Sequence, residues 1–395
     1  MRKVICLVCI ILFSYSMVDA QLDLSYQTPH DDIMALADAP LPPLIRMNSD
    51  GTRALLLYRK AYKSIDELSE TEMRLAGLRI NPKTNISSRA RYYYSIKHYD
   101  VKSKTTSEII GMPKNGKLTN LSWSPDEAKI AFTNTTQEGV ELWYIDWKAR
   151  KASKMTDKML NLNVRSGLVW MNDSETMLVK MLPINRPLLI DTDLSVPSGP
   201  TVSVNEKGQK AQNRTYQDLL KDPNDEHNFE ALANSELYMV GINGSVVKWK
   251  EKGMYSTMSI SPDGKYMLIA EISRPFSYLV TYGRFPTSYD VYDLEGNLVQ
   301  NIVEVPLMEE MPKGFMSTNK GKRSIEWRAD RPSTLVWAEA LDDGDAAKEV
   351  DLRDAVYQVS APFDDEPTLL TKTKLRYSGI EWGSDNLAVV YDYWW

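Results

Sequence analysis

MSISPDG (Met258–Gly264), followed by YMLIA (Tyr266–Ala270), is the part of this sequence from which the fold can be read most directly. Apolar residues on both sides of the Ser-Pro-Asp-Gly segment predict two short β-strands. Proline presets φ at the second turn position, while aspartate and glycine supply the side-chain hydrogen bond and the positive φ that reverse the chain. The stretch therefore predicts a strand, a tight turn and a returning strand.

The same pattern recurs along the chain. A second clear copy is LSWSPD (121–126) before KIAF (129–132), and weaker copies begin at Asn48, Trp170, Trp327 and Trp382. In two copies an outer strand ending in aspartate follows, at Leu142–Asp146 and Tyr289–Asp293. Repeated units of this kind predict an all-β fold, a β-propeller of about seven four-stranded blades. A pair of β-sandwiches is the alternative, which the repeated aromatic–turn–aliphatic unit disfavours.

Helical patterns are short. Asp66–Leu78 is predicted to be helical, with Ser64 as N-cap and Glu67 as its capping-box partner. Thr215–Lys221 is predicted to form one or two helical turns.

The first 20 residues have the composition of an export signal. Arg2 and Lys3 precede the apolar run Val4–Phe13, and Val18-Asp19-Ala20 forms a small-residue cleavage site before Gln21. The apolar run is too short to span a bilayer, so no membrane anchor is expected. Residues 21–45 are then expected to be an extended N-terminal lead-in, and 46–395 the propeller.

The cysteine content, net charge and histidine positions limit the possible compartments and partners of the protein. Both cysteines, Cys6 and Cys9, lie within the predicted signal, so the mature chain has no disulfide, which favours the bacterial periplasm. A formal charge of −6 without a basic block disfavours nucleic acid as a partner. His30, His98 and His227 are too scattered for a zinc site, so neither a metal nor another cofactor is expected.

Two irregular stretches carry more specific information than the repeat. They are Leu75–Asn85 and Arg274–Pro286, and they are supported by Arg323–Pro332 and Trp337–Asp345. Together they resemble the N-terminal β-propeller of glutamyl endopeptidase-like members of the prolyl oligopeptidase family of serine peptidases. The resemblance covers nearly the whole mature chain.

The resemblance implies a seven-bladed propeller followed by a C-terminal α/β-hydrolase domain that supplies Ser, His and Asp. In that family the propeller admits small or unfolded peptides, and the glutamyl branch cleaves after acidic residues, usually Glu. The 395 residues contain no Gly-x-Ser-x-Gly pentad, so no catalytic residue is assigned. The expected role is a substrate-gating portion of an exported peptidase, inactive by itself. The alternative is a stand-alone, non-enzymatic periplasmic propeller that binds peptides or proteins.

The sequence ends at YDYWW (391–395), within an expected strand. The last blade is therefore expected to be incomplete and the hydrolase domain to be absent from this truncated chain. An open last blade would also allow the chain to associate with itself.

Arg274 and Arg284 are the candidate substrate-binding residues. Arginine is suited to a substrate carboxylate because its planar guanidinium can donate two hydrogen bonds to it. Both flank a loop rich in aromatic residues. The alternative is that they stack on these aromatic rings or pair with nearby acids.

The run Asp342-Asp343-Gly344-Asp345, preceded by Glu339, allows three interpretations. It could bind calcium, anchor a substrate amino terminus, or form a solvated turn in which Asp342 or Asp345 pairs with Arg323, Arg328 or Arg353. The turn is the favoured interpretation. Five tryptophans near the turns are predicted to be wedges in the core between blades, at positions 123, 170, 327, 337 and 382.

Overall fold

The computed structural model describes residues 28–395, except 166, 192–193, 195–215 and 385–386. The export signal at 1–20 lies outside these residues and stays a prediction. The chain divides into two compact units. The smaller one consists of the residues up to Pro42 together with the short segment Lys60–Tyr62. It contains helix α2 (Asp31–Ala37), within the range expected to be an extended lead-in. No helix in the described part of the chain has the length and apolar character needed to cross a bilayer.

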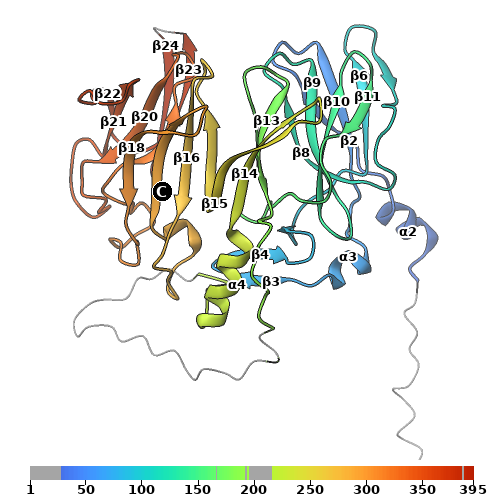
Figure 1. Ribbon diagram of the computed structural model, residues 1–395, viewed down its shortest axis with the longest axis horizontal. Helices are drawn as coiled ribbons and strands as arrows, with labels where there is room; N and C mark the ends of the chain where they lie inside the picture. The colour runs from blue at the N-terminus through green and yellow to red at the C-terminus, as the bar shows by residue number, and fades with distance from the viewer. Residues whose placement is uncertain (1–27, 166, 192–193, 195–215, 385–386) are drawn as a thin grey trace, which may run out of the picture. The chain divides into compact units, whose positions relative to one another are not determined.

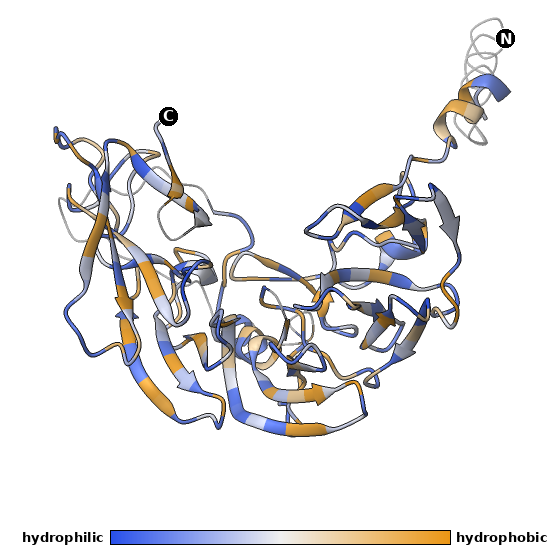
Figure 2. Ribbon diagram, turned by 90° about the horizontal axis from the view of Figure 1, so that it is seen from above, coloured by the Kyte–Doolittle hydropathy of each residue, from blue (hydrophilic) through white to orange (hydrophobic). Residues whose placement is uncertain are grey.

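The larger unit, 43–59 and 63–395, consists of antiparallel β-sheets (Figure 1). The first sheet has the order β1 (Leu44–Met47), β2 (Arg53–Tyr58), β6 (Ser95–Asp100), β7 (Thr105–Ser107). The second has the order β11 (Lys151–Lys154), β10 (Val140–Asp146), β9 (Lys129–Thr135), β8 (Lys117–Trp123). Apolar and polar residues interleave along the strands (Figure 2).

The next sheet has seven strands because one long strand takes part in two four-stranded units. Its order is β12 (Leu168–Trp170), β13 (Thr176–Met181), β14 (Ser235–Gly241), β15 (Val246–Ile260), β16 (Tyr266–Ile272), β17 (Thr287–Asp293), β18 (Leu298–Val305). Residues 246–253 of β15 pair with β14, and residues 254–260 pair with β16. β15 is therefore the outer strand of one unit and the first strand of the next.

The chain continues with β19 (Arg323–Trp327), β20 (Thr334–Ala340), β21 (Asp354–Ser360) and β22 (Thr368–Thr373), then a two-stranded sheet of β23 (Arg376–Ser384) and β24 (Leu387–Tyr393). The predicted fold class, an all-β propeller of four-stranded units, is confirmed. The predicted number of about seven blades is not: the described residues form five four-stranded units, with β15 counted in two, one two-stranded sheet and one small three-stranded sheet.

The predicted turns have the expected geometry. Gly264 has φ +74°, and the Ser261 hydroxyl donates to Asp263 at 2.7 Å. In the second copy Glu127 takes the left-handed position, with φ +54°. Polar bonds also join successive turns, from Asp126 N to Ser174 Oγ at 3.0 Å and from Ser333 Oγ to Asp263 Oδ1 at 2.6 Å. Neighbouring sheets are therefore tied together at their turns.

Tryptophans bridge neighbouring sheets, as predicted. The indole N–H of Trp170 donates to the Ser122 carbonyl, and that of Trp327 donates to the Ser259 carbonyl, both at 3.1 Å. Trp337 is buried, whereas Trp382 is partly exposed and lies 3.8 Å from the Arg328 guanidinium, measured to the ring centre. The Trp170 and Trp327 rings add apolar area to the layer between two sheets while their N–H groups remain hydrogen-bonded, whereas the buried N–H of Trp123 has no such partner in the described part of the chain.

The predicted helix at Asp66–Leu78 is correct only at its start. Helix α3 (Ile65–Ser69) has the expected capping box with Ser64 and Glu67. The following residues form a small sheet of β3 (Met73–Leu75), β4 (Leu78–Asn81) and β5 (Ile86–Ser87). Ala76 and Gly77 both have positive φ, +51° and +86°, which favours a two-residue hairpin over a helix.

The second predicted helix is also wrong. Residues 216–221 are not helical, and residue 215 lies outside the described part. Helix α4 (Pro223–Ala233) begins immediately afterwards, where Asp222 accepts from the backbone N–H groups of Asn224 and Asp225 and proline occupies the first turn.

Candidate functional site

The two stretches that carry the family resemblance lie against each other. The tip of the β3–β4 hairpin contacts the loop at 274–286, where Tyr282 N donates to the Ala76 carbonyl at 2.9 Å. A Cβ on Gly77 would lie only 2.6 Å from Cγ2 of Thr281. Glycine is thus required at this contact by both its positive φ and the close approach.

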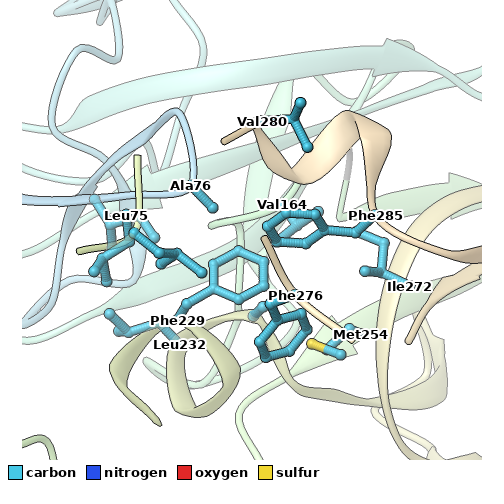
Figure 3. Close-up of a cluster of buried hydrophobic side chains, with 13 residues drawn as sticks. Leu75, Ala76, Val164, Phe229, Leu232, Met254, Ile272, Phe276, Val280 and Phe285 are labelled. Atoms are coloured by element: carbon cyan, nitrogen blue, oxygen red, sulfur yellow. The ribbon is translucent and has the colours of Figure 1, made fainter. Parts of the chain in front are cut away.

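Helix α4 joins the two stretches through its apolar face. Phe229 and Leu232 are buried, and the Phe229 ring meets the rings of Phe276 and Phe285 edge to face, with centroids 5.1 and 5.6 Å away. Figure 3 shows the three phenyl rings together, with Met254 beside Phe276. Such edge-to-face pairs stabilise the cluster beyond their buried area, so the loop, the hairpin and the helix form one packed junction.

Arg274 lies on the surface of this junction, paired with α4. Its guanidinium binds Glu226 at 2.7 Å and Glu230 at 2.8 Å, and lies 4.4 Å from the ring centre of Phe276. Arg274 therefore pairs with acids and stacks on an aromatic ring, as the alternative to substrate binding predicted. A role in binding a substrate carboxylate stays a prediction for Arg274.

Arg284 lies in the 3-10 helix η3 (Tyr282–Arg284), and its guanidinium is 5.3 Å from the ring centre of Tyr216. Its carbonyl accepts from Met308 N at 3.0 Å. The two candidate arginines therefore contact different groups, one on α4 and one in the segment before it. Substrate binding by Arg284 also stays a prediction.

A polar pocket of about 630 Å³ opens beside the hairpin tip. Its lining comes from the hairpin, from β5 and the residues after it, from the segment before α4 and from the 274–286 loop, with one residue before β12: Gly77, Leu78, Arg79, Ser87, Arg89, Asn163, Gln217, Asp218 and Thr281. The volume is in the range typical of ligand sites, although the polar lining is not. Sequence reasoning did not find this pocket, because its walls come from segments far apart along the chain.

An arginine–carboxylate array lies at the pocket wall and directly behind it. Arg79 Nε binds Asp218 at 2.7 Å, while Arg74 and Arg89 each bind Glu72 at 2.9 Å. Burial raises the pKa of Glu72, but hydrogen bonds from Ser88 and the two arginines outweigh it and lower the pKa to about 2. Of these groups, Arg79, Arg89 and Asp218 line the pocket, and two guanidinium groups with one carboxylate leave one net positive charge. The wall is therefore suited to a carboxylate or to peptide carbonyl groups.

Asn163 connects the pocket to α4. Its amide nitrogen donates to the Leu232 carbonyl at 2.9 Å, and the neighbouring Asn161 donates to the same carbonyl at 3.0 Å. These bonds satisfy a carbonyl near the C-terminal end of α4 and fix which way the Asn163 amide points. The helix and the pocket wall are therefore held in register.

A testable consequence concerns Tyr278, whose hydroxyl donates to Glu226 at 2.5 Å. This bond to a carboxylate, together with burial, raises the pKa of Tyr278 to about 12. In a Glu226→Gln variant we expect the pKa to fall toward the ordinary tyrosine value of about 10, measured by NMR titration of ¹³C-labelled tyrosine. Glu230→Gln is the matched control. It removes a carboxylate charge that pairs with Arg274 but leaves the hydrogen bond of the Tyr278 hydroxyl intact. Equal shifts in both variants would contradict the assignment.

The aspartate run at 342–345 forms ion pairs. Asp342 binds Arg353 at 2.8 Å and Arg376 at 2.7 Å, which confirms the predicted pair with Arg353, but its side chain is buried, so the prediction of a solvated turn is wrong at Asp342. Asp343 binds Lys320 and Lys348. Among the described residues no group of three potential ligands is arranged to hold a metal ion. The carboxylates of Asp342 and Asp343 are thus engaged by cationic side chains.

Comparison with known proteins places this geometry in context. The chain is 35% identical over 387 residues to a probable chloroplastic glutamyl endopeptidase of Oryza sativa subsp. japonica, covering 94% of the chain and 41% of the relative. It is 37% identical over 384 residues to the probable chloroplastic glutamyl endopeptidase of Arabidopsis thaliana, covering 94% of the chain and 40% of the relative. No protein-family model matches the chain.

Among solved structures, the chain is similar to the Pyrococcus horikoshii acylaminoacyl peptidase, with a TM-score of 0.40 and 13% identity over 85% of this chain and 40% of that one. It is also similar to the β-propeller domain of the Trilobed protease from Pyrococcus furiosus, with a TM-score of 0.37 and 13% identity over 88% of this chain and 76% of that one. The chain spans about two fifths of the curated relatives it matches, and over that part it is homologous to glutamyl endopeptidase-like proteins.

Proposed function

We propose that this chain is the substrate-gating propeller portion of a glutamyl endopeptidase-like serine peptidase of the prolyl oligopeptidase family. The observation that carries the proposal is the similarity over 94% of the chain to two probable glutamyl endopeptidases. The all-β architecture supports it, because four-stranded antiparallel units of this kind are the blades of propellers, whose narrow central channel would admit extended chains and exclude folded ones. Cleavage itself is assigned to residues outside these 395.

The junction of hairpin, α4 and loop gives the proposal a location. Its polar pocket offers guanidinium groups whose Nε atoms are already held by carboxylates, so little side-chain entropy remains to be lost when a peptide binds. Peptide carbonyl and carboxylate groups are the partners that such guanidinium groups favour. We infer that a passing peptide contacts this wall.

A chimera tests the gating role. The matching 384 residues of the Arabidopsis thaliana relative are replaced by those of this chain, and the chimera is compared with the unmodified relative. We expect the chimera to hydrolyse a short fluorogenic Glu peptide but to leave the same sequence intact within a folded protein. The purified chain alone is expected to hydrolyse neither.

Two results would contradict the proposal. One is hydrolysis by the chain alone that a serine-directed fluorophosphonate abolishes. The other is a chimera that cuts the folded protein as fast as the free peptide. Thermal unfolding of the chimera controls for misfolding, since a misfolded gate would also admit folded substrates.

A further inference from the structure

The polar pocket beside the β3–β4 hairpin contains hydrogen-bond donors that the protein does not use. Arg79 lines this pocket, and its side chain is 30% exposed. Its Nε binds Asp218 at 2.7 Å, whereas the N–H groups of its two terminal nitrogens have no acceptor among the described residues. The outer edge of the Arg79 guanidinium is therefore available to an acceptor from a ligand.

Asp218 holds Arg79 in a fixed position. Its backbone has φ +58°, which is uncommon for a residue other than glycine, and its carbonyl accepts from Gly77 N at 2.8 Å. One residue thus fixes both the tip of the hairpin and the Nε end of the guanidinium. Strained backbone of this kind persists where the surrounding contacts enforce it, and it is concentrated at functional sites. A guanidinium that is already held loses little side-chain entropy when it binds a ligand.

Arg89 places a second unused donor beside the first. Its Nε and one terminal nitrogen bind the two oxygens of Glu72, at 2.9 and 3.2 Å, and its other terminal nitrogen has no acceptor in the described chain. The preceding residue, Ser88, donates its backbone N–H to the Arg79 carbonyl at 3.0 Å, so the two arginines extend from adjacent points of the β4–β5 pair. Both line the pocket. These donors favour a carboxylate over a neutral carbonyl, because charge-assisted hydrogen bonds are about twice as strong.

The same pocket contains a hydrogen-bond acceptor without a donor. Asn163 lines the pocket, is 4% exposed, and donates through Nδ2 to the Leu232 carbonyl at 2.9 Å. Its Oδ1 is buried and has no donor among the residues that the structure describes. The bond to Leu232 prevents the amide from turning over to correct this. A buried acceptor without a partner is unfavourable, and an N–H group from a ligand would satisfy it.

These three side chains together specify the chemistry of the ligand. It must present a carboxylate to the arginines and an N–H group to Asn163. The last residue of a peptide has both, because only the α-carbon separates its backbone N–H from its carboxylate. A glutamate side chain has the carboxylate without an adjacent N–H, and an internal peptide bond has the N–H without the carboxylate. A free amino acid has both groups, but it would fill only a small part of the pocket of about 630 Å³.

We propose that this pocket binds the C-terminal residue of a peptide. Arg79 and Arg89 donate to its α-carboxylate, and Asn163 Oδ1 accepts from its backbone N–H. The inference rests on the proposed function for its ligand, a peptide, and adds which end of the peptide is held and by which groups. A peptide anchored at one end lies in a single direction against the pocket wall.

Fluorescence anisotropy of the full chain with labelled peptides tests the proposal. The probe is a short peptide of alanine, glycine and serine with fluorescein at its N-terminus, prepared with a free C-terminal acid or a C-terminal amide. We expect the acid to bind at least about tenfold more tightly, because the amide loses the charge-assisted hydrogen bonds. An amidated peptide with an internal glutamate should bind like the plain amide. A peptide acid that ends in lactate, with an ester oxygen in place of the last N–H, should bind about fivefold more weakly than the normal acid.

Two arginine variants locate the binding. Arg79→Gln removes the donor edge in the pocket, so it should lower the affinity for the acid about tenfold and leave that for the amide unchanged. Arg74→Gln is the matched control, because Arg74 is paired with Arg79 across β3 and β4 and carries the same charge but does not line the pocket. The control should retain the preference for the acid. Circular dichroism and thermal unfolding verify folding, and the comparison of peptides on the unmodified chain does not depend on the variants.

Several results would overturn the proposal. Equal affinity for the acid and the amide, or no binding of either, would exclude recognition of the C-terminus. Tight binding of the internal-glutamate amide would show that the pocket binds a side-chain carboxylate, and displacement by inorganic phosphate as effective as by unlabelled acid would indicate a general anion site. A lactate-ended peptide that binds like the normal acid would exclude the Asn163 contact on which the choice of ligand rests. Equal losses in the two arginine variants would place the binding outside this pocket.

These outcomes are separate from those of the gating test. A chimera that cuts folded substrates would overturn the proposed function and leave a measured preference for peptide acids as it stands. Absence of that preference would overturn the present inference and leave the result for the chimera unaffected.

Discussion

Replacing Asp354 with alanine should lower the free energy of unfolding by about 3–5 kcal/mol. The Asp354 side chain is fully buried, and its two oxygens bind different arginines: Oδ1 accepts from Arg376 at 3.0 Å and Oδ2 pairs with Arg323 at 2.5 Å. Oδ2 also accepts from the backbone N–H of Tyr377 at 2.7 Å. Removing the carboxylate leaves buried positive charge and a buried N–H without these partners.

The remaining network cannot compensate for this loss. Asp342 is the other fully buried acid, and it already binds Arg353 and Arg376. Burial raises its pKa, but the hydrogen bonds from these two arginines outweigh burial and hold the pKa below the usual range. Three arginines would then share one carboxylate. The network ties the last hairpin to the β19–β22 sheet, so we expect this end of the molecule to loosen first.

Urea unfolding at neutral pH measures the effect of Asp354→Ala, with circular dichroism and tryptophan fluorescence as probes. Asp343→Asn is the matched control, because it removes the charge of an acid in the neighbouring turn whose partners, Lys320 and Lys348, are at the surface, and asparagine tolerates the positive φ of this position, +56°. Exposed pairs contribute little to stability, so the control midpoint should hardly move. Equal loss in the two variants would show that burial of Asp354 has no special weight. A separate early transition seen only by fluorescence would locate the loosening at the last hairpin.

The repeat could be read from the sequence because its signals are local. In Ser261–Gly264 every residue has a role within the turn itself, and the hydroxyl, carboxylate and positive φ appear as expected. The Ser64–Glu67 capping box was predictable for the same reason. The hairpin that follows the capping box was not predictable. Its turn residues, Ala76 and Gly77, fit against Thr281, which lies more than 200 residues later in the chain.

Helix α4 did carry a signal that the turn repeat obscured. Asp222-Pro223 is an N-cap followed by proline at the first position, and Asp225 and Glu226 place negative charge in the first turn. The candidate site was less accessible to sequence reasoning. The sequence suggested Arg274 as a candidate because of its residue type and its aromatic neighbours. Its partners Glu226 and Glu230 are known only once α4 is placed against the loop. Arg79 finds Asp218 across 139 positions, a pairing that spacing cannot predict.

Lys180 leads to the second large prediction, which concerns pH. This residue of β13 is 1% exposed and has no carboxylate partner among the described residues. Its amine donates to the carbonyls of Val164 and of Tyr255, the latter at 3.1 Å. Burial, with a smaller contribution from the charge of Arg165, lowers the pKa of Lys180 to about 7. Neutral amines retain hydrogen-bond donors, so the two carbonyls stay satisfied above that pH.

The sign of the pH effect follows from the protons bound. In the unfolded chain the amine titrates at its ordinary pKa of 10.5, so between pH 7 and 10.5 the unfolded state binds more protons than the folded state. Stability from this group must therefore rise with pH across that window and be constant below it. With about 1.4 kcal/mol for each pH unit, the increase between pH 7 and pH 10 is about 3–4 kcal/mol.

A Lys180→Met variant should lack this increase. We expect the free energy of unfolding of the variant, minus that of the unmodified chain, to fall by about 3–4 kcal/mol between pH 7 and pH 10 in urea titrations at fixed ionic strength. Taking the difference cancels the tyrosines that titrate in the same range. Lys248→Met is the control, because the hydrogen bonds that Lys248 donates to Glu251 and Glu236 raise its pKa and give no such increase. A difference that stays constant with pH would mean that Lys180 remains charged in the core, held by carbonyl dipoles alone.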